Sequence, residues 1–231
     1  MTVGAVLSDT WALYKRLFLR TFAVGGLVFL LIELVEAGAG GGRSLPLALF
    51  ALALALVGTA FVQGALVEVV RDVHEGEQEP RLSATYERAA PQLGALVAVS
   101  LLAGLGIGVG LLILIVPGVV LAVRWSLVVP VVILEEASTR AAFGRSSELV
   151  RGHGWAVFRV LLNVALISAA LGLGISFAIV QALPSHAFLS LWLGGALGGA
   201  IATPYAAHAM TVVYYRLTEP DKPMIPEARL R

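Results

Sequence analysis

The chain has 231 residues, of which 58% are hydrophobic and 13% charged, and its formal net charge is +1. A soluble domain carries about 25% charged residues, so this composition excludes an ordinary water-soluble fold and indicates a protein of the lipid bilayer. The small net charge gives no support to nucleic-acid binding, and the absence of cysteine excludes disulfides, thiolate metal sites and a cysteine nucleophile.

The first twenty residues have the pattern of an amphipathic helix. Apolar side chains recur at helical spacing at Val3, Leu7, Trp11, Tyr14 and Phe18, with polar residues between them. We therefore expect residues 1–20 to form an interfacial helix at the membrane surface. Such a helix either anchors the entry of the first span or binds lipid or a partner.

Six segments are long and apolar enough to cross a bilayer. A hydrocarbon core about 30 Å thick takes roughly 20 helical residues. Glycine and proline residues at 38–42, at Pro117-Gly118 and around Pro184 predict turns between spans on one side of the membrane. The predicted spans are 21–36, 45–70, 92–116, 119–134, 155–181 and 187–217.

The predicted fold class is therefore an all-α polytopic bundle that forms one membrane domain over residues 1–231, with the spans at 21–217 and a cytoplasmic tail at 218–231. The fourth span is short, because 16 residues rise only about 24 Å. It is a tilted span, a re-entrant segment or a helix kinked at Pro130. A cleavable signal peptide is disfavoured, since Glu33 interrupts the apolar run and about 20 residues precede it.

Cationic residues gather on one side of this topology. Fourteen of the sixteen Lys and Arg residues fall on the side of both termini, whereas Arg43 falls on the other side and Arg124 lies within the fourth span. The positive-inside rule then places both termini in the cytoplasm. We predict a multi-pass protein of the bacterial plasma membrane.

Two polar segments lie on the cationic side. Between the fourth and fifth spans, Ser138 is placed to cap a helix that stops near Gly152, with an ordinary basic loop as the alternative. The loop at 71–91 is the most polar part of the chain, and we expect a solvated connector that leads to a short surface helix at 83–90. The candidate surface for anionic lipid or a partner comprises Arg140, Arg145 and Arg151.

Charged side chains within spans are costly and mark candidate sites. Glu33 and Glu36 lie toward the outer end of the first span, and Arg124 lies five to seven residues beyond Pro117-Gly118. We expect Arg124 to face the bundle interior and to pair with Glu33 or Glu36, either as a staple or as part of a polar cavity. His208, in the last span, is either a packing residue or a proton relay.

Glycines four residues apart predict close helix packing at Gly104 with Gly108, Gly106 with Gly110, Gly194 with Gly198 and Gly195 with Gly199. The nucleotide-binding loop, the nucleophile elbow of esterases and the zinc-binding HExxH motif do not occur, and the four histidines are scattered. The sequence therefore predicts no catalytic residue, metal or cofactor.

The segment Val123-Arg124-Trp125-Ser126-Leu127 through Glu135, followed by the run from Ala141 to Trp155, resembles the membrane-domain family of glycerophosphoryl diester phosphodiesterase. The last span, from Thr203-Pro204-Tyr205 to Tyr214-Tyr215-Arg216, is similar to that of the family. The resemblance implies a six-helix membrane module that is fused to a cytoplasmic phosphodiesterase barrel in some members. Only fourteen residues follow Leu217 here, so the resemblance implies no catalytic residue in this chain.

Together these features predict a non-enzymatic membrane scaffold or accessory module. Its expected partners are membrane lipids, and a cytoplasmic protein partner and self-association stay open. A small transporter or channel with a polar site between helices is the alternative, and an intramembrane lipid enzyme comes third because it would need converging polar side chains.

Overall fold

The computed structural model describes residues 2–39, 44–76 and 82–224, and every regular element within these ranges is a helix. Six helical stretches are long and apolar enough to cross a membrane, which confirms the predicted all-α bundle of about six spans. The helices are α1 (Val3–Ala39), α2 (Leu45–Glu75), α3 (Leu82–Ala89), the 3₁₀ turn η1 (Ala90–Gln92), α4 (Leu93–Ile113), α5 (Ile115–Arg124), α6 (Val128–Leu134), α7 (Thr139–Val150), α8 (Gly154–Ala182) and α9 (Ala187–Thr218).

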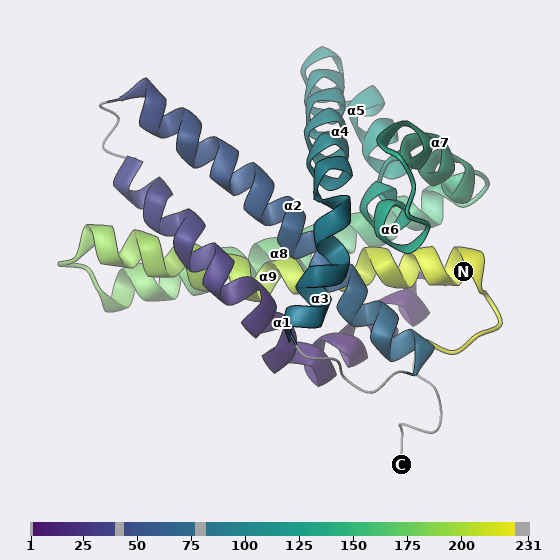
Figure 1. Cartoon of the computed structure of the whole chain (residues 1–231), viewed down its shortest axis with the longest axis horizontal. Coiled ribbons are helices and arrows are strands. Elements are labelled where there is room, and N and C mark those ends of the chain that lie inside the picture. The colour runs from purple at the N-terminus through teal and green to yellow at the C-terminus, as the bar shows by residue number, and fades with distance from the viewer. Residues whose placement is uncertain (1, 40–43, 77–81, 225–231) are drawn as a thin grey trace.

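Three helix hairpins meet at a common base, α1 with α2, α4 with α5 and α8 with α9, and α1 also packs along α9 (Figure 1). The short helices α3, α6 and α7 lie at the base. Buried apolar side chains, among them Val69, Leu127 and Val212, form one cluster there. Toward the far ends, large apolar side chains such as Leu112 and Leu173 are not covered by protein, as expected where lipid is the solvent.

The first and last helices run antiparallel along each other. Near the base, the Arg216 guanidinium contacts the Asp9 carboxylate at 2.5 Å. Farther along, the Tyr14 hydroxyl donates to the Ile201 carbonyl at 2.9 Å. Near the far end, the Trp192 indole N–H donates to the carbonyl of Leu30. The start of α1 and the end of α9 therefore lie at the same end of the bundle, which agrees with an even number of spans.

The structure corrects the boundary of the first span. Residues 3–20 do not form a separate helix but continue without interruption into the span, because no glycine or proline lies between Ala5 and Val24. The apolar stripe of this part, including Leu13 and Leu17, is buried against the protein. At 1.5 Å per residue the 37 residues of α1 measure about 55 Å, so the helix is longer than the hydrocarbon core is thick.

The turn into the fourth span lies earlier than predicted. Helix α4 ends at Ile113, and Leu114 alone adopts extended backbone before α5 begins. The two helices then pass very close, since a Cβ added to Gly110 would lie 2.8 Å from the Cα of Gly118. Pro117 falls in the first turn of α5, where no intrahelical partner is needed for its missing N–H.

The fourth span is interrupted at 125–127, one turn before Pro130, and not at the proline itself. A proline ring collides with the carbonyl four residues earlier, which is that of Ser126, and it cannot donate to it. The chain therefore leaves the helix after Arg124 and starts α6 at Val128. This interruption places the side chain of Arg124 at a helix end.

The predicted packing glycines differ in their surroundings: Gly106, Gly110, Gly195 and Gly199 all lie against a neighbouring helix or side chain. A Cβ on Gly194 would lie 3.3 Å from the Cα of Ser176, and one on Gly198 would lie 3.0 Å from the carbonyl oxygen of Gly172, so α8 and α9 approach closely there. Added Cβ atoms at Gly104 and Gly108 would meet nothing within 4 Å. Those two glycines make no close helix contact within the chain, because the opposite face of α4 packs against α5.

Some predicted features fall outside the described residues. These are the greater part of the glycine-rich turn at 38–42, the cations Arg43, Arg81, Arg229 and Arg231, and the end of the tail at 218–231.

The topology predicts that the α8–α9 turn and the α6–α7 turn lie on opposite sides of the membrane. Ser185 and Ser138 are exposed in these turns, and the chain has no native cysteine to interfere. In sealed vesicles, Ser185→Cys and Ser138→Cys should react with a membrane-impermeant maleimide from opposite sides. Labelling of both from one side would contradict the six-span arrangement.

Candidate functional site

Two carboxylates are buried in the last turns of α2, at the base of the bundle. The side chains of Glu68 and Asp72 are only 3% and 2% exposed. They lie four residues apart and therefore on one face of the helix. Their neighbours Val69 and Val70 are fully buried. Charges in such surroundings require partners within the protein.

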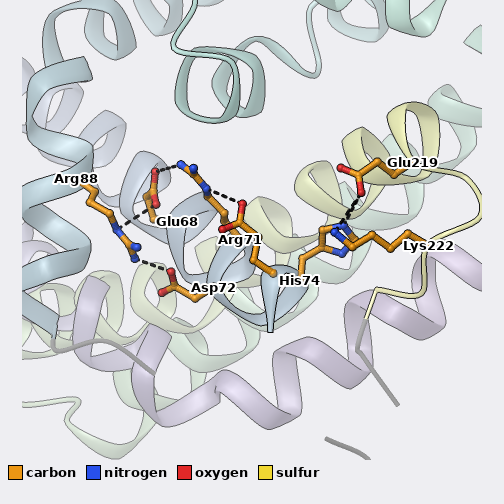
Figure 2. Close-up of polar contacts among 8 residues, drawn as sticks. Glu68, Arg71, Asp72, His74, Arg88, Glu219 and Lys222 are labelled. Carbon is orange, nitrogen blue, oxygen red and sulfur yellow. Dashed lines mark hydrogen bonds and ion pairs between the residues drawn. The ribbon is translucent and has the colours of Figure 1, made fainter. Parts of the chain in front are cut away.

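Arginines from three helices supply these partners. Arg20 of α1 approaches Asp72 at 3.1 Å and also donates to the Thr85 hydroxyl of α3 at 3.2 Å. Arg88 of α3 approaches Asp72 at 2.5 Å and Glu68 at 3.3 Å. Figure 2 shows Arg88 extending toward both carboxylates while Arg71 approaches Glu68 from the other side. We call the residues Arg20, Glu68, Arg71, Asp72 and Arg88 the base network.

A second polar contact joins α2 to the end of α9. The buried His74 ring lies 3.3 Å from a Glu219 carboxylate oxygen and packs on the Tyr215 ring, with centroids 3.8 Å apart. Lys222 also contacts Glu219 at 3.3 Å (Figure 2). Partial burial by itself would raise the pKa of Glu219. Hydrogen bonds from His74 and Lys222 outweigh this effect, and the pKa of Glu219 is lowered. Its contribution to stability is therefore present above the usual carboxyl pKa and is lost as the pH falls through the lowered value.

These contacts are not predicted from the sequence, where residues 71–91 have the composition of a solvated connector. In the structure, Asp72, His74 and Thr85 of this range are buried instead. The predicted short helix is present as α3, but it packs onto the bundle: Tyr86 stacks on Phe61, with ring centroids 5.3 Å apart. The available signal was the pair of carboxylates four residues apart, Glu68 and Asp72, at the end of a long apolar run.

A groove lies between α5, α7 and the start of α8, with a volume of about 530 Å³, which is within the range of small-molecule sites. Its walls are mainly apolar, and two guanidinium groups belong to its lining. The lining includes Val119, Val120, Arg124, Arg151, Trp155 and Phe158.

The interruption of the fourth span fixes the position of Arg124. The hydroxyl of Ser146, a fully buried residue of α7, donates to the Arg124 carbonyl at 2.7 Å. The Ser146 hydroxyl oxygen in turn accepts from the Leu127 N–H at 3.2 Å, so this one side chain pairs with backbone groups on both sides of the break. Helix α7 ends at Val150, and Gly152 then turns the chain with a φ of 83°. That left-handed turn directs the chain from Arg151 into α8.

The two arginines of the groove are free. Within the described part of the chain, the side chains of Arg124 and Arg151 are exposed and make no hydrogen bond or ion pair. Among the residues that the structure describes, no acidic side chain lines the groove. Arg145 differs, because both oxygens of the Glu135 carboxylate accept from it at 3.0 Å, and the Tyr214 hydroxyl donates to the same carboxylate. Of the three predicted surface arginines, Arg145 is thus engaged within the bundle.

Residues 96–197 match the family described as the membrane domain of glycerophosphoryl diester phosphodiesterase. This segment, 102 of the 231 residues of the chain, is similar to that membrane-domain family. The match extends from α4 into α9 and contains every residue of the groove. It confirms the resemblance seen in the sequence. Neither the curated proteins nor the solved structures compared with the chain give a match.

The other predicted intramembrane residues lie outside the segment that matches the membrane-domain family. Glu33 packs directly against Gly195 of α9, while Glu36 is exposed. The predicted ion pair of Arg124 with either of them does not form among the described residues. The turn at Leu114 is the reason, since it places Arg124 ten residues, or about 15 Å, along α5 and close to the base.

His208 is fully enclosed beside an aromatic cluster, with the Tyr14 ring centroid 6.4 Å away. Neither of its ring nitrogens has a hydrogen-bond partner in the described structure. A proton relay needs a group that exchanges a proton at hydrogen-bond distance, and among the described residues neither ring nitrogen has one. The surroundings therefore fit a packing residue.

The base network predicts a large loss of stability when Asp72 is neutralised. Asp72→Asn keeps the shape of the side chain but leaves Arg20, only 10% exposed, without its carboxylate. We expect a loss of about 3 kcal/mol, because breaking a buried pair leaves an uncompensated charge. Glu75→Gln is the control, since Glu75 is 41% exposed and its pair with Arg71 is worth at most about 0.5 kcal/mol. Denaturation in detergent, followed by circular dichroism, measures both, and equal losses would contradict the assignment.

Proposed function

We propose that this chain is a membrane module without catalytic activity of its own that binds anionic lipid head groups at the face formed by α5, α7 and α8. The observation that carries the proposal is the pair of unengaged guanidinium groups, Arg124 and Arg151, beside an apolar groove. Guanidinium groups suit phosphate because their planar fork can donate two parallel hydrogen bonds. Arg140, exposed at the start of α7, adds a third cation to this face.

The charge distribution supports binding at the cytoplasmic leaflet. Those cationic residues of the described chain that the positive-inside rule assigns to the cytoplasm lie toward the base, and the corrected position of Arg124 adds this residue to them. Anionic lipids give that leaflet its negative surface potential, which attracts a nearby basic residue by about 1 kcal/mol. Both termini would then be cytoplasmic.

The engagement of the buried carboxylates supports a binding role over a catalytic one. Glu68 and Asp72 are the most enclosed acidic groups of the described chain, and arginines hold both. An acid or base in catalysis has to reach a substrate proton at hydrogen-bond distance. The base network uses its carboxylates to join α1, α2 and α3 instead.

Neutralising the two groove arginines should abolish selection of anionic lipid. The chain is purified from mixed micelles with equal amounts of phosphatidylglycerol and phosphatidylcholine, and the bound lipids are counted by mass spectrometry. Each arginine attracts the anionic lipid by about 1 kcal/mol. The variant Arg124→Gln/Arg151→Gln should therefore lower the enrichment of phosphatidylglycerol roughly tenfold or more. Lys15→Gln/Arg16→Gln removes the same charge from exposed positions of α1 and should leave it unchanged. Equal enrichment in both variants would reject the proposal.

A small transporter is the second candidate, and one observation favours it. A cavity of about 130 Å³ lies beside the interrupted fourth span, with Gln63, Ser126 and Thr203 in its lining. Broken helices next to polar cavities form the substrate sites of many transporters.

A single introduced cysteine tests the transporter. If the cavity belongs to a passage, Ser126→Cys should react with a small impermeant thiol reagent from both sides of a sealed vesicle. Ser190→Cys, at a residue only 4% exposed, measures the background. Protection of the cysteine at position 126 from both sides removes this candidate.

A further inference from the structure

We infer that the groove holds one anionic glycerophospholipid, with its phosphate at Arg124 and Arg151 and the first part of an acyl chain along the valines of α5 and the aromatic rings of α8. The inference rests on the proposed function and deepens it, because it replaces a cationic surface by a discrete site with one occupant. Four features of the groove carry it.

The first feature is the separation of charge and apolar surface along the groove. Helix α5 ends at Arg124, and Val120 and Val119 precede it by four and five residues, so they lie about 6 to 7.5 Å farther from the base. Arg151 directly follows the last residue of α7 and lines the same end of the groove, beside the turn into α8. The groove is therefore cationic at the base and apolar farther into the span, which is the order of head group and chain in a lipid leaflet.

The second feature is the aromatic wall at the start of α8. Trp155 is 69% exposed and stacks on Phe158, with ring centroids 5.2 Å apart. Tryptophan is enriched at the level of lipid head groups, where its indole ring contacts both apolar chains and polar groups. Trp155 thus places the cationic end of the groove at the membrane interface, where a phosphate of the leaflet lies.

The third feature is the backbone at the α7–α8 turn. Helix α8 begins at Gly154, and the cap residue His153 makes no side-chain hydrogen bond to the helix. The first N–H groups of a helix lack intrahelical acceptors and favour a negative charge. Gly152 and Gly154 line the groove, and a Cβ on either would meet nothing within 4 Å. Space and donors are therefore present next to the two arginines.

The fourth feature is the balance of charge. The lining contains two guanidinium groups and no carboxylate, so an anion gains attraction without displacing an existing ion pair. A soluble phosphate ester would leave the valines and aromatic rings of the groove without an apolar partner. A lipid has a phosphate for the cationic end of the groove and an acyl chain for the apolar end. It reaches the site laterally from the leaflet.

A pair of glycine substitutions tests occupancy of the groove. Gly154→Trp should fill the groove, whereas Gly144→Trp is the matched control, because Gly144 is an exposed glycine of α7 with equally open space and no place in the lining. The detergent-solubilised chain is titrated with dioctanoyl phosphatidylglycerol in native mass spectrometry. We expect one lipid per chain, at least about tenfold weaker binding in Gly154→Trp, and unchanged binding in Gly144→Trp.

The outcomes separate this inference from the proposed function. Unchanged binding in Gly154→Trp, together with loss in Arg124→Gln/Arg151→Gln, would overturn the groove site and keep a cationic lipid surface. Unchanged binding in both variants would overturn both. Glycerol 3-phosphate should bind at least about tenfold more weakly than the lipid, and equal affinity would show a soluble phosphate ester as the ligand and overturn the lipid assignment.

Discussion

Hydrocarbon surrounds most of this chain, so every charge that leaves the aqueous surface needs a partner within the protein. In the base network, two buried carboxylates on α2 are paired with arginines from α1, α2 and α3. The far ends of the helix pairs need no such contacts, and they present apolar side chains outward. The ion pairs of the base network consequently join the helices at the base, whereas farther out the contacts between helices are mainly apolar, with single hydrogen bonds such as that from Trp192 to the Leu30 carbonyl.

Interruptions of helices create a groove in which two arginines stay unengaged beside apolar surface. Pro130 ends the helix before it, Ser146 satisfies the exposed backbone groups, and Gly152 turns the chain after α7. As a result α5 stops at Arg124 next to Arg151. The groove thus arises from backbone breaks, and the match to the membrane-domain family covers all of it.

The contrast among the arginines of α7 shows how tertiary contacts sort similar residues into different roles. Arg145 and Arg151 lie six residues apart on or next to the same short helix. Arg145 is held by Glu135, which also accepts from Tyr214 of α9, and so it joins α6, α7 and α9. Arg151, at the helix end, faces no carboxylate and lines the groove. A count of positive charges on the loop does not distinguish them.

The sequence alone determined the features that depend on local composition. It determined the six spans, because segment length and hydropathy decide whether a helix can cross a bilayer. It also determined the end of α7 near Gly152, because a left-handed turn favours glycine. It also placed Gly194 and Gly198, whose close contacts with α8 follow from residue size. Only the tertiary structure decided which charges meet. Arg124 lies far along α5 because the chain turns at Leu114, and Asp72 is buried because α1 and α3 cover it. Ion pairs depend on the relative position of helices distant in sequence, which spacing along the chain does not encode.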